Sequence, residues 1–173
     1  MRKPILALLG LASFTAGSAH AAGLQLLSTD AQHHVVVNGV PIGIPVASFA
    51  PACQGDPKAA TSVCVVFDQG NDPWAVNEVY GLPPVLDGAG RLVFNRTTVT
   101  SWNGVIDGVE LGFTNEVYDI AVRDSMTTAV GQPDVQDKNG VAEWHHVLPG
   151  HVIVVTPPDR YPSFAVVVDD GSP

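Results

Sequence analysis

The sequence is poor in basic residues, and this shortage limits the partners that the protein can have. Only eight residues are lysine or arginine, against seventeen that are aspartate or glutamate. Two of the eight, Arg2 and Lys3, lie in the first segment, so the remainder carries a formal balance of −11. A surface of that sign repels nucleic acid and favours basic partners. We therefore expect no nucleic-acid partner.

Cysteine is also scarce, since Cys53 and Cys64 are the only two in the sequence. In an oxidising compartment, two cysteines this close along the chain most often form a disulfide. A catalytic thiol would need an activating histidine or helix N-terminus beside it, and nothing local provides one. The pair therefore predicts a structural disulfide.

Motifs of the common hydrolases and nucleotide-binding enzymes are absent. The sequence contains no Gly-x-Ser-x-Gly, His-Glu-x-x-His or Ser-x-x-Lys motif and no phosphate-binding loop. We therefore expect no catalytic residues, no cofactor and no enzymatic activity. A hydrolase whose site assembles only in three dimensions stays open as an alternative.

The sequence has one apolar segment at its start, which is too short to span a bilayer as a stable helix, and no other apolar run approaches membrane-spanning length. That segment, residues 1–21, combines a charged start, an apolar stretch and the small residues of Ala19-His20-Ala21, which is typical of a secretory signal peptide. We predict a periplasmic or secreted bacterial protein whose mature chain has no transmembrane segment. Residues 22–173 would form a single domain, with 169–173 frayed at its end.

Short runs of β-branched and aromatic residues, separated by Gly, Pro, Asn and Asp, dominate this domain. They predict strands at 33–37, 62–67, 91–99, 105–113, 142–147, 151–156 and 163–168. Asn38-Gly39 and Pro149-Gly150 have the composition of tight turns that join neighbouring strands. We therefore expect an antiparallel sheet.

Residues 115–130 instead have the periodicity of a helix. Its apolar half would hold Val117, Tyr118, Ala121, Val122, Met126 and Ala129. Asp119 and Arg123 would form an ion pair on the polar half, Thr114 would cap the start, and Gly131 would end the helix. The expected fold class is α+β: a β-rich antiparallel single domain with this one main helix packed on the sheet.

Residues 105–168 resemble a module of small exported bacterial proteins. The resemblance rests on Val109-Glu110-Leu111-Gly112, the helix, Gly131-Gln132-Pro133, Trp144, and the apolar runs 152–155 and 164–168. Among named families, this stretch is similar to the β-lactamase inhibitor protein and the small outer-membrane-assembly lipoproteins. The chain departs from the lipoproteins because residue 22, directly after the expected cleavage point, is alanine instead of a cysteine that could carry a lipid. It also has one clear helix where their modules usually begin with two. The resemblance implies a binding module without catalysis.

Two histidines offer a metal-binding alternative. Across the predicted two-residue turn, His151 would lie opposite Leu148 and diagonal to His146, on one face of the sheet. The two imidazoles would then share a zinc or copper ion with a carboxylate such as Glu143. The simpler interpretation is that both rings are exposed on a polar sheet face.

Trp74 lies in the sequence Asp72-Pro73-Trp74-Ala75, which predicts a loop. An exposed tryptophan in a loop is a plausible binding anchor, whereas packing under the loop is the commoner outcome. The sequence as a whole favours an exported, non-catalytic module that binds another protein, as an inhibitor or accessory factor of the bacterial cell envelope. The expected partner is a basic envelope or extracellular protein.

Overall fold

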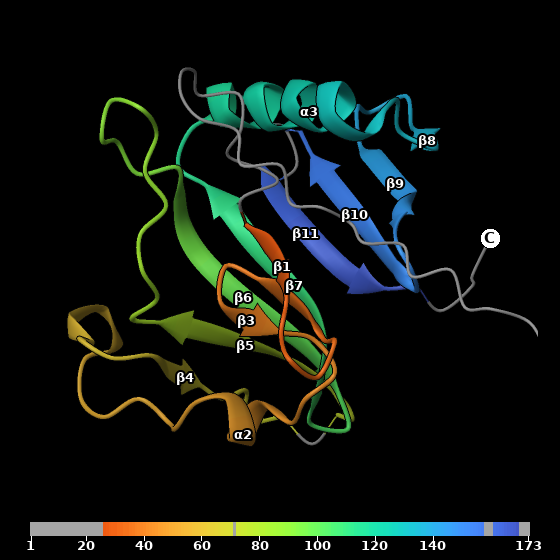
Figure 1. The fold of residues 1–173 in the computed structure, drawn as a ribbon. Helices are drawn as coiled ribbons and strands as arrows, with labels where there is room; N and C mark the ends of the chain where they lie inside the picture. The colour runs from red at the N-terminus through yellow and green to blue at the C-terminus, as the bar shows by residue number, and fades with distance from the viewer. Residues whose placement is uncertain (1–25, 71, 158–160, 170–173) are drawn as a thin grey trace, which may run out of the picture.

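The structure of the chain is a computed structural model that describes residues 26–70, 72–157 and 161–169 (Figure 1). The expected signal peptide, residues 1–21, lies outside the described residues, as do residues 170–173 of the end expected to fray. Asp169, the first residue of that end, is held in place because its N–H donates a hydrogen bond to the Gly150 carbonyl at 2.9 Å.

The described residues form a strand-rich domain with one long helix. The strands are β1 (Leu27–Thr29), β2 (Val35–Val37), β3 (Val40–Pro41), β4 (Cys64–Val66), β5 (Trp74–Tyr80), β6 (Phe94–Trp102), β7 (Val105–Phe113), β8 (Val135–Gln136), β9 (Ala142–Leu148), β10 (His151–Thr156) and β11 (Ser163–Val168). The helices are α2 (Val46–Phe49), the 3-10 turn η2 (Pro57–Ala59) and α3 (Glu116–Val130). Among the described residues, no helix is both long and apolar enough to cross a membrane.

The main sheet has eight strands in the order β4-β5-β6-β7-β11-β10-β9-β8, and every neighbouring pair is antiparallel. Helix α3 carries the chain from β7, in the middle of the sheet, to β8 at one edge. Strands β9, β10 and β11 then return until β11 pairs with β7. This topology confirms the expected α+β fold with one main helix on an antiparallel sheet.

Helix α3 and the small sheet β1-β2-β3 pack on the same face of the main sheet (Figure 1). Side chains from all three parts belong to one core. Leu111 and Phe164 are wholly buried on the main sheet, Met126 on α3, and Val37 and Val40 at the turn of the small sheet. That turn is the predicted Asn38-Gly39 pair, with φ of 48° and 83°.

Strand β5 was not predicted, because its polar residues broke the alternation expected of a strand. Asn77 occupies a core-facing position, where it is almost wholly buried. Its amide nitrogen donates to Ser101 Oγ at 3.4 Å and its oxygen accepts from the Asp68 N–H at 3.0 Å. These bonds satisfy the buried amide, so the polar residue is compatible with a central strand. The predicted bounds of β7, β10 and β11 are confirmed.

Helix α3 has the predicted position, but two details of the prediction were wrong. Asn115, rather than Thr114, caps the start: its Oδ1 accepts from the Val117 N–H at 3.0 Å. The buried face is also rotated, since Val117 is exposed and Asp119 is only 1% exposed. Asp119 still forms the predicted ion pair with Arg123, at 3.3 Å, and its burial raises the pKa of the carboxyl despite the cation beside it.

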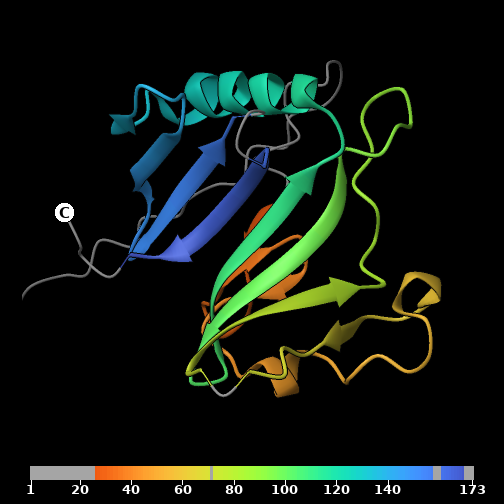
Figure 2. The same cartoon turned by 180° about the vertical axis from the view of Figure 1, so that it is seen from behind.

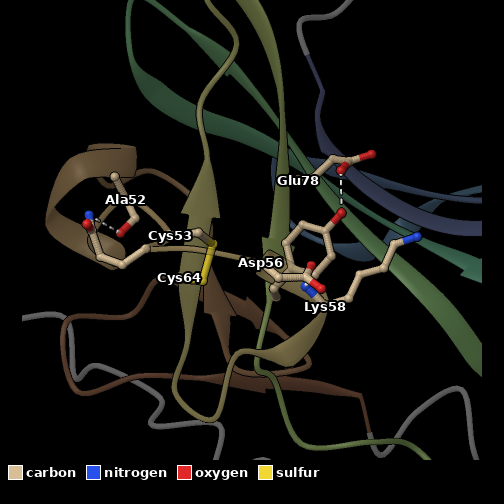
Figure 3. The surroundings of a disulfide bond; sticks show 8 residues. Ala52, Cys53, Asp56, Lys58, Cys64 and Glu78 are labelled. Carbon is tan, nitrogen blue, oxygen red and sulfur yellow. Dashed lines mark hydrogen bonds between the residues drawn. A yellow bond between two sulfur atoms is a disulfide. The ribbon is translucent and has the colours of Figure 1, made fainter.

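The predicted disulfide between Cys53 and Cys64 joins the loop before η2 to the edge strand β4 (Figure 3). Next to it, the Val65 N–H donates to the Pro51 carbonyl at 2.9 Å, and the Val65 carbonyl accepts from the Cys53 N–H at 3.0 Å. The loop therefore covers the outer edge of β4 with backbone hydrogen bonds. An uncovered edge is a template for pairing with another chain, and the disulfide keeps the cover in place.

Replacing both cysteines with serine is expected to lower the free energy of unfolding by about 3 kcal/mol, the chain-entropy contribution of a short disulfide loop. Because the cover of β4 is then released more readily, the variant is also expected to self-associate. Urea denaturation and light scattering measure the two effects. A double variant as stable and as monodisperse as the parent would contradict this account of the disulfide.

Candidate functional site

One face of the main sheet carries no described element, and we call it the outer face (Figure 2). Helix α3 and the small sheet lie on the opposite side, so residues that alternate with the core point toward the outer face. On β5, for example, Asn77 and Val79 are buried, whereas Trp74, Val76 and Glu78 are exposed. The outer face is thus a surface that the described part of the fold leaves open for a partner.

A row of three exposed apolar residues crosses one end of the outer face. Trp74 of β5 lies opposite Trp102 of β6, and Trp102 lies opposite Val105 of β7. The exposed fractions are 49% for Trp74 and 54% for Trp102. The third tryptophan of the chain, Trp144, is wholly buried. We call Trp74, Trp102 and Val105 the tryptophan row.

The structure corrects the predicted setting of Trp74. The residue begins strand β5 instead of lying in a loop, and the Asp72 carboxylate fixes its backbone by accepting from the Trp74 N–H at 2.9 Å. Sequence reasoning missed Trp102, which lies directly before Asn103-Gly104. That dipeptide, with φ of 49° and 76°, makes the tight turn between β6 and β7, and it could have placed Trp102 at the end of a hairpin.

The next row of the outer face is small and apolar. It runs Val76, Thr100, Gly108, Val167, Val152 across five strands. A Cβ at Gly108 would lie 2.5 Å from Thr100 Oγ1 and 2.9 Å from Val167 Cγ1. Because Gly108 has no side chain, Thr100 and Val167 can pack against its backbone. No side chain therefore projects from the outer face at this position, next to the tryptophan row.

Carboxylates surround this apolar end. Asp68, Asp72 and Glu78 are all exposed on β5 or in the segment that leads into it. Of the described lysines and arginines, none lies in the tryptophan row or the row beside it. Tyr80 stays neutral, since its hydroxyl donates to Glu78 at 2.6 Å and this bond raises the tyrosine pKa. The apolar end of the outer face is therefore negatively flanked.

A cavity of about 470 Å³ opens where β5 diverges from β6. The divergence begins at Gly81, whose φ of 74° and close approach to the Ser62 carbonyl leave no room for a side chain. Its lining includes the apolar Pro83 and Pro84 and the charged Lys58 and Glu78. This mixture of charges and apolar groups favours no single ligand chemistry.

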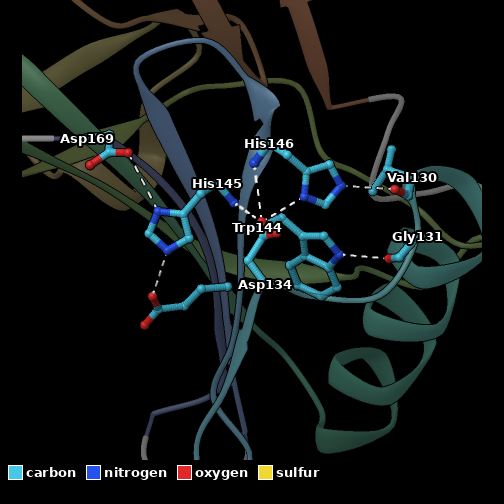
Figure 4. Close-up of polar contacts among 8 residues, drawn as sticks. Val130, Gly131, Asp134, Trp144, His145, His146 and Asp169 are labelled. Atoms are coloured by element: carbon cyan, nitrogen blue, oxygen red, sulfur yellow. Dashed lines mark hydrogen bonds and ion pairs between the residues drawn. The ribbon is translucent and has the colours of Figure 1, made fainter. Parts of the chain in front are cut away.

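The two histidines of the predicted metal site make separate contacts. His146 Nδ1 lies 2.7 Å from Asp134 Oδ2, and its Nε2 lies 3.1 Å from the Val130 carbonyl (Figure 4). His151 bonds instead to the Pro149 carbonyl within its own turn, at 3.0 Å. His151 does lie opposite Leu148 as predicted, but a bulge then shifts the register to Ile153 opposite Trp144. The regular diagonal on which the metal prediction relied is therefore absent.

No group of three or more metal-ligating side chains gathers within the ranges that the structure describes. A metal at His146 would also have to displace an existing partner from one ring nitrogen. Zinc or copper binding by His146 and His151 remains a prediction without structural support.

His146 ties the end of helix α3 to strand β9. Both of its ring partners are acceptors, so only the doubly protonated ring can donate to both (Figure 4). The Val130 carbonyl, and then Asp134, raise the histidine pKa accordingly. Beside it, Trp144 Nε1 donates to the Gly131 carbonyl at 3.0 Å. These two side chains satisfy carbonyl groups at the C-terminal end of α3, where a positive charge is favourable.

His145 points to the other side of β9 and contacts a different pair of carboxylates. Its Nε2 lies 3.2 Å from Glu143, and its Nδ1 lies 3.5 Å from Asp169 (Figure 4). Desolvation of the ring lowers its pKa, but the bonds to Glu143 and Asp169 outweigh that effect and raise it overall. Asp169 thereby links the end of β11 to β9.

No protein-family model matches the chain, and no curated protein or solved structure is significantly similar to it. The resemblance of residues 105–168 to the inhibitor and lipoprotein families is thus neither supported nor contradicted. Function has to be argued from the outer face itself.

The contact between His146 and α3 is expected to make stability depend on pH. Because folding raises the pKa of His146, its contribution is fully present below the unfolded value of about 6.5. The contribution is lost as the pH rises from there through the folded-state pKa. Urea denaturation of the parent and of His146→Gln at several pH values, followed by tryptophan fluorescence, measures this contribution. The difference between their midpoints should shrink as the pH rises.

His151→Gln is the matched control, since that ring bonds only within its own turn. A midpoint difference for His146→Gln that stays constant, or grows, with increasing pH would contradict the proposed charged contact.

Proposed function

We propose that the protein is an exported, non-catalytic binding module that recognises a basic protein through the tryptophan row. The observation that carries this proposal is the pairing of Trp74 with Trp102 on an open sheet face, with about half of each side chain exposed. In a folded chain, leaving two adjacent tryptophans in water forgoes the burial of a large apolar area. A partner that covers them would recover that free energy.

The tryptophan row has the amino-acid composition that is typical of the central part of a protein–protein interface. Tryptophan is enriched among the residues that dominate binding energy, and such residues cluster where neighbours exclude water. Val105 and Val76 extend the apolar area around the two rings, and both are about two-fifths exposed. Both tryptophans lie on paired strands, so little conformational entropy is lost when they are covered.

The charge around the row supports a basic partner. Asp68, Asp72 and Glu78 flank it, in a chain whose residues after position 21 carry a formal balance of −11. Opposite charges speed the encounter of two proteins and discriminate against wrong partners. An acidic partner would be repelled at this end of the face.

Export is supported by the disulfide, because such bonds persist in oxidising compartments such as the periplasm. The expected signal peptide points the same way. Within the bacterial envelope the module would act as an inhibitor or an accessory factor. The resemblance of residues 105–168 implies a binding module without catalysis, which agrees with this proposal. Trp74 and Trp102 both precede residue 105, so the resemblance does not include them.

Replacing both Trp74 and Trp102 with alanine is expected to weaken partner binding by about tenfold or more, as loss of two interface anchors does. The parent and the variant, each immobilised, are compared for capture of basic proteins from an envelope extract, and affinities for the captured protein are then measured. About half of each side chain is buried, so the variant should lose some stability but stay folded. Ile120→Ala, which removes an exposed apolar side chain on α3, is the control.

The proposal requires one basic protein that the parent and Ile120→Ala retain and the tryptophan variant loses. It would be abandoned if the tryptophan variant bound the captured protein as tightly as the parent, or if the parent captured no basic protein.

Association with that partner is expected to slow by about tenfold or more between low and high salt, because ions screen long-range attraction. Stopped-flow measurement of the association rate constant over a salt series tests this. Asp72→Asn and Glu78→Gln should reduce the salt dependence. An association rate that salt leaves unchanged would rule out charge steering.

A further inference from the structure

The opposite end of the outer face holds a hollow of about 390 Å³, far from the tryptophan row along β7. Its lining comes from four neighbouring strands and the segment before β11: Arg96, Glu110, Thr156, Tyr161 and Ser163. Register places Arg96 opposite Gly112, Gly112 opposite Ser163, and Ser163 opposite Thr156. We call these five lining residues the hydroxyl hollow. Its volume falls in the range of about 300–1,000 Å³ usual for small-molecule sites.

Several polar groups in the hollow have donors or acceptors that make no hydrogen bond to another described residue. The Thr156 and Ser163 hydroxyls make no hydrogen bond to another described side chain or backbone group, although Ser163 is only 5% exposed. Arg96 uses one terminal nitrogen for Glu110, at 3.0 Å, which leaves other N–H donors and the second Glu110 oxygen available. The hollow therefore offers both donors and acceptors to a ligand.

The charges in the hollow indicate which class of ligand it can bind. Arg96 and Glu110 neutralise one another, so neither an anion nor a cation gains a net attraction. No aliphatic side chain lines the hollow within the described residues, so an apolar ligand would bury unpaired polar groups. A neutral ligand with several hydroxyl groups fits both constraints, because each hydroxyl can donate and accept.

Tyr161 supplies an aromatic surface at the rim. Its side chain is 83% exposed, and its backbone has a φ of 59°, a conformation that a bulky residue rarely adopts. The following residue is fixed by a hydrogen bond from the Phe113 N–H to the Pro162 carbonyl at 2.9 Å. Tyr161 lines the hollow and is not packed into the core, so the negative face of its ring is available to the C–H face of a sugar ring.

We infer that the hydroxyl hollow binds a neutral saccharide, with a sugar ring stacked on Tyr161 and its hydroxyls bonded to Arg96, Glu110, Ser163 and Thr156. This site goes beyond the proposed protein-binding function and does not involve the tryptophan row. Single sugar rings on open surfaces bind weakly, so the expected dissociation constant for an oligosaccharide is on the order of 1 mM.

The test is titration of the isotope-labelled protein with chitotetraose, cellotetraose and maltotetraose, which together cover both common linkage geometries, followed by amide chemical shifts. At least one oligosaccharide should shift residues of the hollow saturably. Tyr161→Ala should raise the dissociation constant by about tenfold or more, whereas Tyr161→Phe keeps the stacking ring and should change it by less than about threefold. Trp74→Ala is the control that should leave saccharide binding unchanged.

Ser163→Ala gives an independent measure, since it removes one hydroxyl without touching the ring, and it should weaken binding severalfold. The chemical-shift spectrum of each variant reports whether the fold is retained. The inference is overturned if none of the three oligosaccharides shifts the hollow at about 10 mM. It is equally overturned if Tyr161→Ala binds like the parent, or if the shifts cluster at the tryptophan row. Because the Trp74 and Trp102 variants are tested with a protein partner, either site can fail while the other stands.

Discussion

The antiparallel pairing of β7 with β11 is the contact on which the rest of the structure depends. It joins Val109 to Val166 and Leu111 to Phe164, so four wholly or almost wholly buried side chains meet at the centre of the sheet. One side of this seam holds strands β4 to β7, and the other holds the strands that follow α3. Closing it brings together segments separated by the whole of α3 and three further strands, which costs loop entropy that the central core has to offset. Without this pairing, neither the single core nor the continuous outer face would exist.

The parts of the fold that depend on local sequence were predictable, and the parts that depend on pairing between distant strands were not. Strands β10 and β11 and the position of α3 follow from composition, turn residues and periodicity over a few residues. Strand β5 was not predicted because Asn77 faces the core, where an apolar residue would be expected. Hydrogen bonds with Ser101 and with the Asp68 N–H satisfy its amide there. The buried side of α3 was misjudged for a similar reason, since a carboxylate is expected outside unless a partner such as Arg123 lies beside it.

The candidate sites were harder to foresee, because their members come from strands that are adjacent only once the register is known. Trp74 and Trp102 are 28 positions apart in sequence and directly opposite in β5 and β6. The ion pair of Arg96 and Glu110 likewise joins neighbouring strands β6 and β7. His146 was assigned to metal because a regular hairpin would have aimed it toward His151. The bulge in β9 lets it reach the end of α3 instead, a change that residue spacing does not reveal.

The outer face has two chemically different ends, and its length lets both be occupied at once. Along β7, the tryptophan row lies at Val105 and the lining of the hydroxyl hollow begins at Glu110, a separation of at most about 17 Å at the usual rise of a strand. The low surface at Gly108 lies between them, so a ligand at one end need not obstruct the other. A glycosylated or glycan-bound basic protein would meet both ends together, and the second contact would then form at a high effective concentration. Two weak sites on one rigid sheet can in this way produce a stronger and more selective attachment than either alone, because the sheet fixes their spacing before binding.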